Sequence, residues 1–243
     1  MANLYYLLLA SGIILAQTTT FEAASIRVNR SGSNSIGGSG VCFSGGRVSV
    51  RNMPFSMIMQ RAFDVKDFQI VGLPGSLGAE RFDIEAKPAS PVKYAECLQM
   101  LQALLKERFQ LEFHREDRQL PVFNLVAIKS GPKMKKLPDS GPTGVKVFNN
   151  GKFDTDTFGI SMERLASILS TFQEIGKPVI DQTGLNGIYQ VKLEWMPEHG
   201  NAEQTGISLF AALQEQLGLK LKPGKGGISV IVIDHINKTA TEN

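Results

Sequence analysis

One stretch of this sequence occurs twice, and it constrains the fold more than any other feature. Residues 101–113 read LQALLKERFQLEF, and 108 positions later residues 209–221 read LFAALQEQLGLKL. The matched apolar residues are Leu101 and Leu209, Leu105 and Leu213, Phe109 and Leu217, Leu111 and Leu219, and Phe113 and Leu221. The first three pairs recur every four residues, as on one face of a helix, and the last three recur every two, as on one face of a strand. Each copy is therefore predicted to be a helix that runs directly into a strand.

The repeat continues on both sides of this stretch. Further matches, at offsets of 110 and 108, join Phe55, Ile58 and Met59 to Leu165, Ile168 and Leu169, and Leu120 and Val122 to Ile228 and Val230. An offset that drifts so little indicates a duplication. Each copy is predicted to have the order β-α-β-β-α-β-β, and helices that cover one face of a mixed sheet make an α+β unit. We expect two tandem α+β units, each a small mixed sheet with two helices on one face.

Turn-forming residues give the expected boundaries. Residues 130–144 contain three Pro and three Gly, which is typical of a linker or a long loop. The expected parts are a signal peptide at 1–16, an N-terminal strand and Gly/Ser-rich loop at 17–45, a first unit at 46–129, a linker and hairpin at 130–157, a second unit at 158–238 and a tail at 239–243. Residues 114–118 and 222–227 are predicted to be turns between strands, and Val230 is expected on an edge strand.

The N-terminus indicates export. Residues 1–16 contain no charged side chain, and the apolar run Leu4 to Ala16 is too short to span a bilayer comfortably. Such a run is typical of the apolar region of a secretory signal, with cleavage near Ala16. A retained N-terminal anchor is the alternative, and a buried strand is a third interpretation. We expect a periplasmic or extracellular mature chain without a transmembrane span.

The two cysteines allow two interpretations. In an oxidising compartment Cys42 and Cys97 can form a disulfide. Cys97 also lies on an apolar helix face beside Leu98 and Leu101, where a buried thiol fits equally well. Both alternatives stay open at this point.

Charge and motif patterns indicate little chemistry. The net charge of +3 is spread along the chain, apart from a local cluster at Lys129–Lys136, whereas nucleic-acid binding requires a clustered basic face. His114, His199 and His235 show no metal-binding spacing. We therefore expect no nucleic-acid partner, and we assign no catalytic residue, metal site or cofactor.

A few residues are candidates for a binding surface. Trp195 ends a predicted strand, where a large ring can either cap the core or present a binding face. Tyr189, His114 and His235 are the other candidates. They lie on predicted strands or at strand ends.

The motifs that follow one another along the chain resemble those of a known family. They include GGRVSVRNMPFSMIMQRAF, RFDIEAKP, PVFNLVAIKSGPK, KPVIDQTGLNGIYQVKLEW and VIVIDHINK, in addition to the two repeated stretches. Together they resemble the acidobacterial soil-associated family of unknown function, from Phe21 onward. Some members of that family are fused behind a membrane-bound antirepressor-type metallopeptidase, and others are free-standing exported proteins. The family carries no agreed catalytic residues.

Each half also resembles, more distantly, the short N-terminal domain of secretins and TonB-dependent receptors. That resemblance implies a periplasmic module that docks partner proteins. We therefore expect an exported, non-catalytic binding or docking module whose partner is an envelope protein or a cell-surface component. The alternatives are a hydrolytic enzyme whose site is assembled from residues distant in sequence, and a stand-alone sensor domain of an antirepressor-type signalling system.

Overall fold

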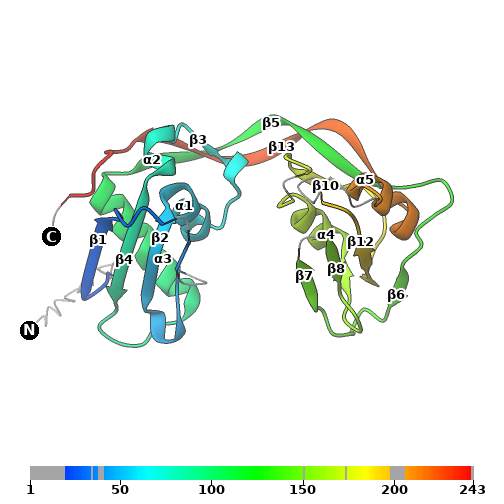
Figure 1. Ribbon diagram of the computed structural model, residues 1–243, viewed down its shortest axis with the longest axis horizontal. Coiled ribbons are helices and arrows are strands. Elements are labelled where there is room, and N and C mark those ends of the chain that lie inside the picture. The colour runs from blue at the N-terminus through cyan, green and yellow to red at the C-terminus, as the bar shows by residue number, and fades with distance from the viewer. Residues whose placement is uncertain are drawn as a thin grey trace, which may run out of the picture. The chain divides into compact units, whose positions relative to one another are not determined.

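The computed structural model describes residues 20–33, 35–37, 41–149, 151–172, 174–197 and 206–241, with only the backbone of residues 147–149 (Figure 1). The predicted signal peptide, His199 and parts of the two loops at 31–40 and 196–206 lie outside the described residues. The described chain contains both helices and strands, and the strands form several small sheets. This confirms the predicted α+β class. None of the described helices is long and apolar enough to cross a membrane.

The chain divides into two compact units, neither of which is continuous in sequence. Unit 1 comprises residues 1–67, 72–113 and 233–243, and unit 2 comprises residues 68–71 and 114–232. The segment 130–157, where the sequence analysis places a linker, lies within unit 2 in this division and contributes three short strands there.

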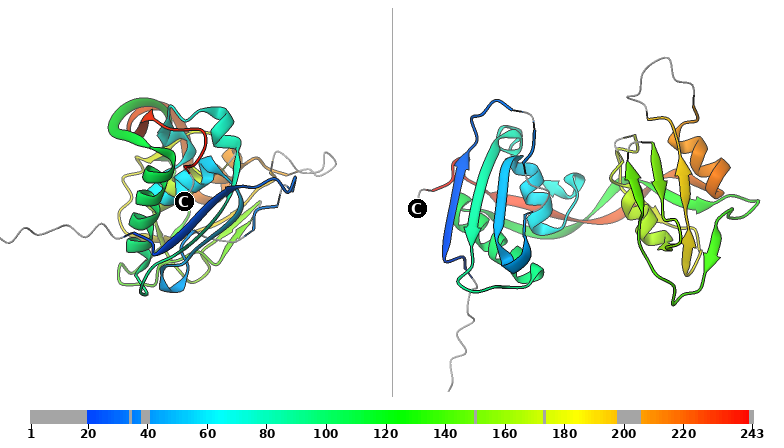
Figure 2. Two further views of the ribbon diagram at one scale, coloured as in Figure 1. Left: turned by 90° about the vertical axis from the view of Figure 1, so that its left-hand side faces the viewer. Right: turned by 60° about the horizontal axis from the view of Figure 1, so that its bottom comes forward.

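In its described residues, unit 1 has one three-stranded sheet, three α-helices and one short 3-10 helix. Its elements are β1 (Ala23–Val28), η1 (Ser44–Gly46), β2 (Val48–Pro54), α1 (Phe55–Phe63), α2 (Gly75–Ala79), β4 (Arg81–Lys87) and α3 (Tyr94–Phe109). The strand order is β1-β4-β2 and both pairings are antiparallel, so that β4 is central and β1 is an edge strand. The right-hand view of Figure 2 shows β1, in dark blue, at the margin of this sheet.

Aromatic packing joins the helices of unit 1 to its sheet. The rings of Phe55 in α1, Phe82 in β4 and Phe109 in α3 contact one another, with centroids 4.5 to 5.6 Å apart. All three side chains are buried. Alternation in β4 directs Phe82 and Ile84 into this core, so one face of the sheet carries the helices.

A bulge in β2 anchors the loop that follows β1. The pairing with β4 shifts between Val50 and Met53, and Asn52 adopts a φ of 52° there. Its amide nitrogen Nδ2 donates to the carbonyl oxygens of Ser33 and Ser35, both at 2.7 Å. Asn is one of the few residues that tolerate this left-handed backbone conformation, so one side chain both permits the bulge and holds the loop.

The described residues of unit 2 form three small sheets. Its elements are η2 (Asp67–Gln69, whose first residue belongs to unit 1), β3 (Ile70–Val71), β6 (Lys135–Leu137), β7 (Val147–Asn149), β8 (Lys152–Asp154), β9 (Ile160–Ser161), α4 (Met162–Leu169), β10 (Val179–Asp181), β11 (Ile188–Gln190), β12 (Lys192–Glu194), α5 (Leu209–Ala212) and the π-helix η3 (Leu213–Leu217). Most residues of the long strands β5 (Glu112–Ala127) and β13 (Leu219–His235) also belong to it. The strand orders are β10-β5-β13-β3, β6-β11-β9 and β12-β8-β7.

The two repeated stretches fold as predicted. Helix α3 ends at Phe109 and β5 begins at Glu112, whereas η3 ends at Leu217 and β13 begins at Leu219. A single residue in the left-handed conformation ends each helix, Gln110 with a φ of 47° and Gly218 with a φ of 67°. The matched Leu and Phe side chains are buried, apart from Phe113, which is half-buried, so these positions belong to the core.

Two of the predicted turns do not form. Residues 114–118 continue the strand β5, and residues 222–227 continue the strand β13. The two strands are neighbours in the four-stranded sheet, so that regular backbone pairing continues through sequences that are charged or rich in Gly. Val230 is likewise not on an edge strand, because β13 lies between β5 and β3.

Candidate functional site

The cysteines are bonded to each other in unit 1. The disulfide joins Cys42 to Cys97 of α3, with the two Cα atoms 6.2 Å apart. Of the two alternatives for these cysteines, the structure therefore has the disulfide and not the buried thiol. Neither presents a thiol that could act as a nucleophile or a metal ligand.

Two of the candidate surface aromatics are core residues. Tyr189 and Trp195 are 6% and 8% exposed and belong to the core cluster of unit 2. The Trp195 ring stacks on Phe172 at 5.1 Å, and its Nε1 donates to Glu174 at 3.2 Å. The sequence interpretation of these two residues as a binding surface is wrong, because the strands direct both rings into the core. For Trp195 the core-capping alternative is correct.

The two described histidines lie at the surface. Nε2 of the half-exposed His114 is 3.8 Å from a carboxylate oxygen of Glu116, and His235 is exposed at the end of β13. Over the described residues, no group of three or more His, Cys, Asp or Glu side chains could hold a metal ion.

Unit 2 has an open polar cavity of about 430 Å³. Its lining residues are Lys133, Met134, Lys135, Asp154, Asp156, Gln190, Lys192, Gln216 and Leu217. Lys146, near its rim, donates a hydrogen bond to Asp156, and this bond together with the carboxylate charge raises the pKa of Lys146. Glu194 lies on β12, which pairs with β8. A hydrogen bond from Lys152 of β8 and the charge of Lys192 lower the pKa of Glu194. Opposite charges on this surface thus partner each other.

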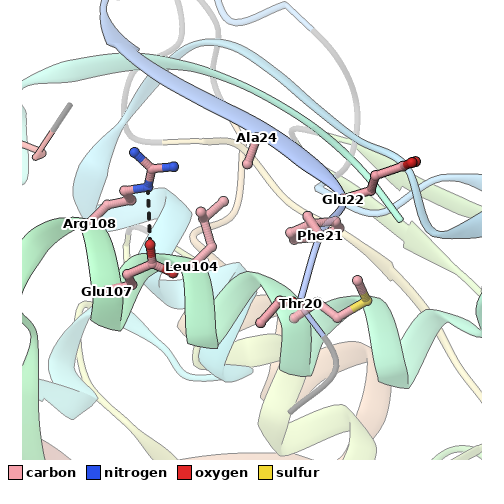
Figure 3. A pocket seen from close by; sticks show the side chains of 8 residues that line it. Thr20, Phe21, Glu22, Ala24, Leu104, Glu107 and Arg108 are labelled. Carbon is pink, nitrogen blue, oxygen red and sulfur yellow. Dashed lines mark ion pairs between the residues drawn. The ribbon is translucent and has the colours of Figure 1, made fainter. Parts of the chain in front are cut away.

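Another cavity, of about 220 Å³, lies in unit 1 between the start of β1 and α3 (Figure 3). It is lined by Thr20, Phe21, Glu22, Ala24, Met100, Leu104, Glu107 and Arg108. Met100 and Leu104 are almost fully buried. The small side chain of Ala24 lies across the groove from Leu104 (Figure 3). The cavity is therefore a groove between an edge strand and a helix, and its accessible lining is mostly polar.

Arg108 lies at one end of this groove, and not all of its N–H groups have a hydrogen-bond acceptor in the residues that the structure describes. Its side chain is 15% exposed, and its buried Nε has no hydrogen-bond partner among the described atoms. One terminal nitrogen donates to the carbonyl of Thr241 at 3.3 Å, and the Glu107 carboxylate lies 3.8 Å from Nε, which is too far for a hydrogen bond. A guanidinium has five N–H donors, so Arg108 can donate further bonds to an acceptor on a bound chain.

The backbone of β1 has one free side. The N–H of Asn29 donates to the carbonyl of Arg81 at 2.8 Å, and the antiparallel register with β4 continues from there through the whole strand. Because bonding to one neighbour involves every second residue, Ala24, Ile26 and Val28 direct their N–H and C=O groups away from β4. In the described part of the chain no other strand pairs with this side of β1.

In unit 2, the segment just before the edge strand β6 is hydrogen-bonded to the helix η3. The backbone N–H of Lys133, just before β6, donates to the carbonyl of Leu217 at 3.0 Å. Its Nζ donates to the carbonyl of Glu215 at 2.8 Å. These bonds place that segment beside η3, where both line the open cavity of unit 2.

Sequence reasoning missed this groove. The sequence predicts only an N-terminal strand within residues 17–45, and nothing in the composition of this segment indicates that one side of the strand stays unpaired. The available signal is the excess of small residues, since Ala23, Ala24 and Ser25 follow one another in a strand that packs beside a helix.

The comparisons with known proteins identify a family for most of the chain. The family model described as protein of unknown function (DUF3738) matches residues 56–236. Neither the curated proteins nor the solved structures include a match to the chain.

Proposed function

We propose that this chain, which belongs to the DUF3738 family of proteins of unknown function, is a non-catalytic docking module of the bacterial cell envelope. It binds an extended segment of a partner protein along β1. The observation that carries this proposal is the free edge of β1 beside the groove to α3.

Strand addition uses groups that are already in place. An added strand bonds to the outward N–H and C=O groups of Ala24, Ile26 and Val28, which supplies affinity without regard to sequence. Alternate side chains of that strand point toward α3. Arg108, at one end of this mostly polar groove, suits an acceptor such as a carboxylate on one of these side chains.

Several features support a place in the cell envelope. Cys42 and Cys97 form a disulfide, and disulfides persist in oxidising compartments such as the periplasm. The apolar, uncharged sequence of residues 1–16 is typical of a secretory signal. The resemblance of each half to the short N-terminal domain of secretins and TonB-dependent receptors, and of the chain to an acidobacterial soil-associated family, favours the same role.

A crosslinking experiment tests the proposal. A photoreactive amino acid replaces Val28, whose side chain is 38% exposed at the free edge, and the protein is irradiated in the envelope fraction of its native host. We expect a crosslink to a different protein, mapped by mass spectrometry to one short segment. Ile26→Pro, which removes the outward N–H at the middle of β1, abolishes it.

The matched control places the photoreactive group at Tyr94, which is 60% exposed at the start of α3. Crosslinks from position 94 report collisions without strand pairing. If position 28 yields the same adducts as position 94, or if Ile26→Pro leaves its adducts unchanged in a folded protein, β1 is not the docking edge.

A further inference from the structure

We propose that a second copy of this chain occupies the free edge of β1 when no other strand does, through antiparallel β1–β1 pairing centred on Ile26. This inference rests on the proposed function, because it assigns a partner to the same docking edge. Three independent features of the edge are self-complementary about Ile26: its backbone groups, its apolar side chains and the charges at its ends.

The backbone groups match in this register. A two-fold axis at Ile26 places Ile26 opposite Ile26 of the second copy and Ala24 opposite Val28 of the second copy. The three residues that direct N–H and C=O groups outward therefore all fall in hydrogen-bonded pairs. No outward group between Ala24 and Val28 is left without a partner.

The apolar side chains match as well. Ala24, Ile26 and Val28 lie opposite the buried Ala86, Ile84 and Phe82 of β4, so their side chains point to the helix side of the sheet. Val28 is 38% exposed because no strand covers it. Pairing about Ile26 places the small Ala24 beside Val28 of the second copy, and it removes apolar surface from water at both positions.

The charges at the two ends of β1 are opposite. Glu22 precedes the strand and Arg30 follows it; both are exposed, and within the described chain neither side chain makes an ion pair or hydrogen bond. Glu22 lies at a bend just before the strand, where its N–H donates to the carbonyl of Lys87 at 2.9 Å. The register centred on Ile26 therefore brings Glu22 near, but not directly across from, Arg30 of the second copy, and the symmetry makes this approach twice. Opposite charges close to each other on antiparallel strands stabilise the pairing.

One alternative register, centred on Arg27, is disfavoured by charge. Pairing centred on Arg27 also aligns outward backbone groups, but it places Arg27 opposite Arg27 of the second copy. Like charges directly opposite destabilise a strand pair. In the register centred on Ile26, Arg27 lies opposite the uncharged Ser25 of the second copy.

Sedimentation equilibrium of the purified chain tests this pairing. We expect an average mass that rises with concentration toward twice that of one chain, and Ile26→Pro keeps the protein monomeric. The substitution removes no bond to β4, because the Ile26 N–H points away from that strand. Circular dichroism checks that the variant is folded, and a wild-type protein that stays monomeric at all concentrations overturns the proposal.

Charge reversal tests the register. Glu22→Arg or Arg30→Glu converts two attractive pairs into two repulsive ones, and we expect each to raise the dimer dissociation constant by about tenfold. The double variant Glu22→Arg/Arg30→Glu restores wild-type association. Lys129→Glu, an equal charge change at an exposed residue of unit 2, leaves it unaltered. Dimers that ignore both single reversals overturn the proposed register.

The two proposals fail separately. Adducts between two copies at position 28, without any other partner, support the self-pairing and count against the docking function. Adducts to another protein from a strictly monomeric chain do the reverse.

Discussion

Cys42 and Cys97 are bonded in unit 1, so a loop of 55 residues that includes β2, α1 and β4 is closed covalently at α3. Such a closure removes conformations from the unfolded chain more than it adds contacts to the folded one. The stability of unit 1 is therefore linked to the redox state of its surroundings.

Reduction of this disulfide lowers the stability of the protein. We expect Cys42→Ala/Cys97→Ala to reduce the free energy of unfolding of unit 1 by about 2–4 kcal/mol, measured by urea denaturation. Reductant shifts the wild-type midpoint to the same value and leaves the double variant unaltered. Equal wild-type midpoints with and without reductant contradict the prediction.

Asn52 contributes through two effects that substitutions can separate. Asn52→Ala removes the bonds to Ser33 and Ser35 and leaves a side chain that disfavours a φ of 52°, so we expect a loss of about 1–3 kcal/mol. Asn52→Gly removes the same bonds but adopts this conformation freely. Glycine should therefore cost less than alanine in thermal unfolding. Equal losses would assign the whole effect to the hydrogen bonds.

The residues that end the two repeated helices differ in how tightly they are surrounded. A Cβ on Gly218 would lie 2.4 Å from the carbonyl oxygen of Gly131, whereas Gln110 already carries a side chain in the left-handed conformation. We expect Gly218→Ala to cost about 2–4 kcal/mol and Gln110→Ala less than about 1 kcal/mol, by urea denaturation. Similar costs would show that the chain around Gly131 can move aside.

Glu194 reports the charge arrangement on the surface of unit 2. Its pKa is lowered first by the hydrogen bond from Lys152, and then by the charge of Lys192. Any stabilisation from this group is present above its unfolded-state pKa and is lost as the pH falls through the lower folded-state value. NMR titration should show the pKa of Glu194 rising toward the ordinary value in Lys152→Met. An unshifted titration in that variant would assign the effect to Lys192 alone.

The parts of the fold that depend on local spacing were predictable. Leucines and phenylalanines four and then two residues apart indicated the helix α3 and its passage into β5, because burial follows the backbone period. The continuity of β5 through residues 114–118 was not predictable, since it depends on pairing with β13, about a hundred residues away in sequence. The same holds for the candidate site. Whether β1 or the strand around Val230 is an edge is decided by which strands are neighbours, and the sequence of neither strand records this.

The strand β3 shows that an element from the first repeat pairs within the sheet of unit 2. Ile70 pairs in parallel with Ile231 of β13, and Val179 of β10 pairs in parallel with Phe123 of β5. The repeat offset of 108 to 110 positions relates Ile70 to Val179 and Phe123 to Ile231. Ile70 thus contributes to the sheet of unit 2, although its neighbours in sequence on both sides belong to unit 1.

We therefore expect Ile70→Pro to weaken unit 2 selectively, because the fixed φ and the bulky ring of proline disturb the parallel pairing of β3 with β13. Hydrogen exchange measures this residue by residue. The amides of Ile231 and Val232 should lose protection, whereas those of Val50 and Ile84, in the sheet of unit 1, should keep it. Ile26→Pro is the matched control, because it places proline on an unpaired side of β1 and should leave the protection of Ile231 unaltered. Loss of protection at Ile84 instead of Ile231 would assign Ile70 to the stability of unit 1.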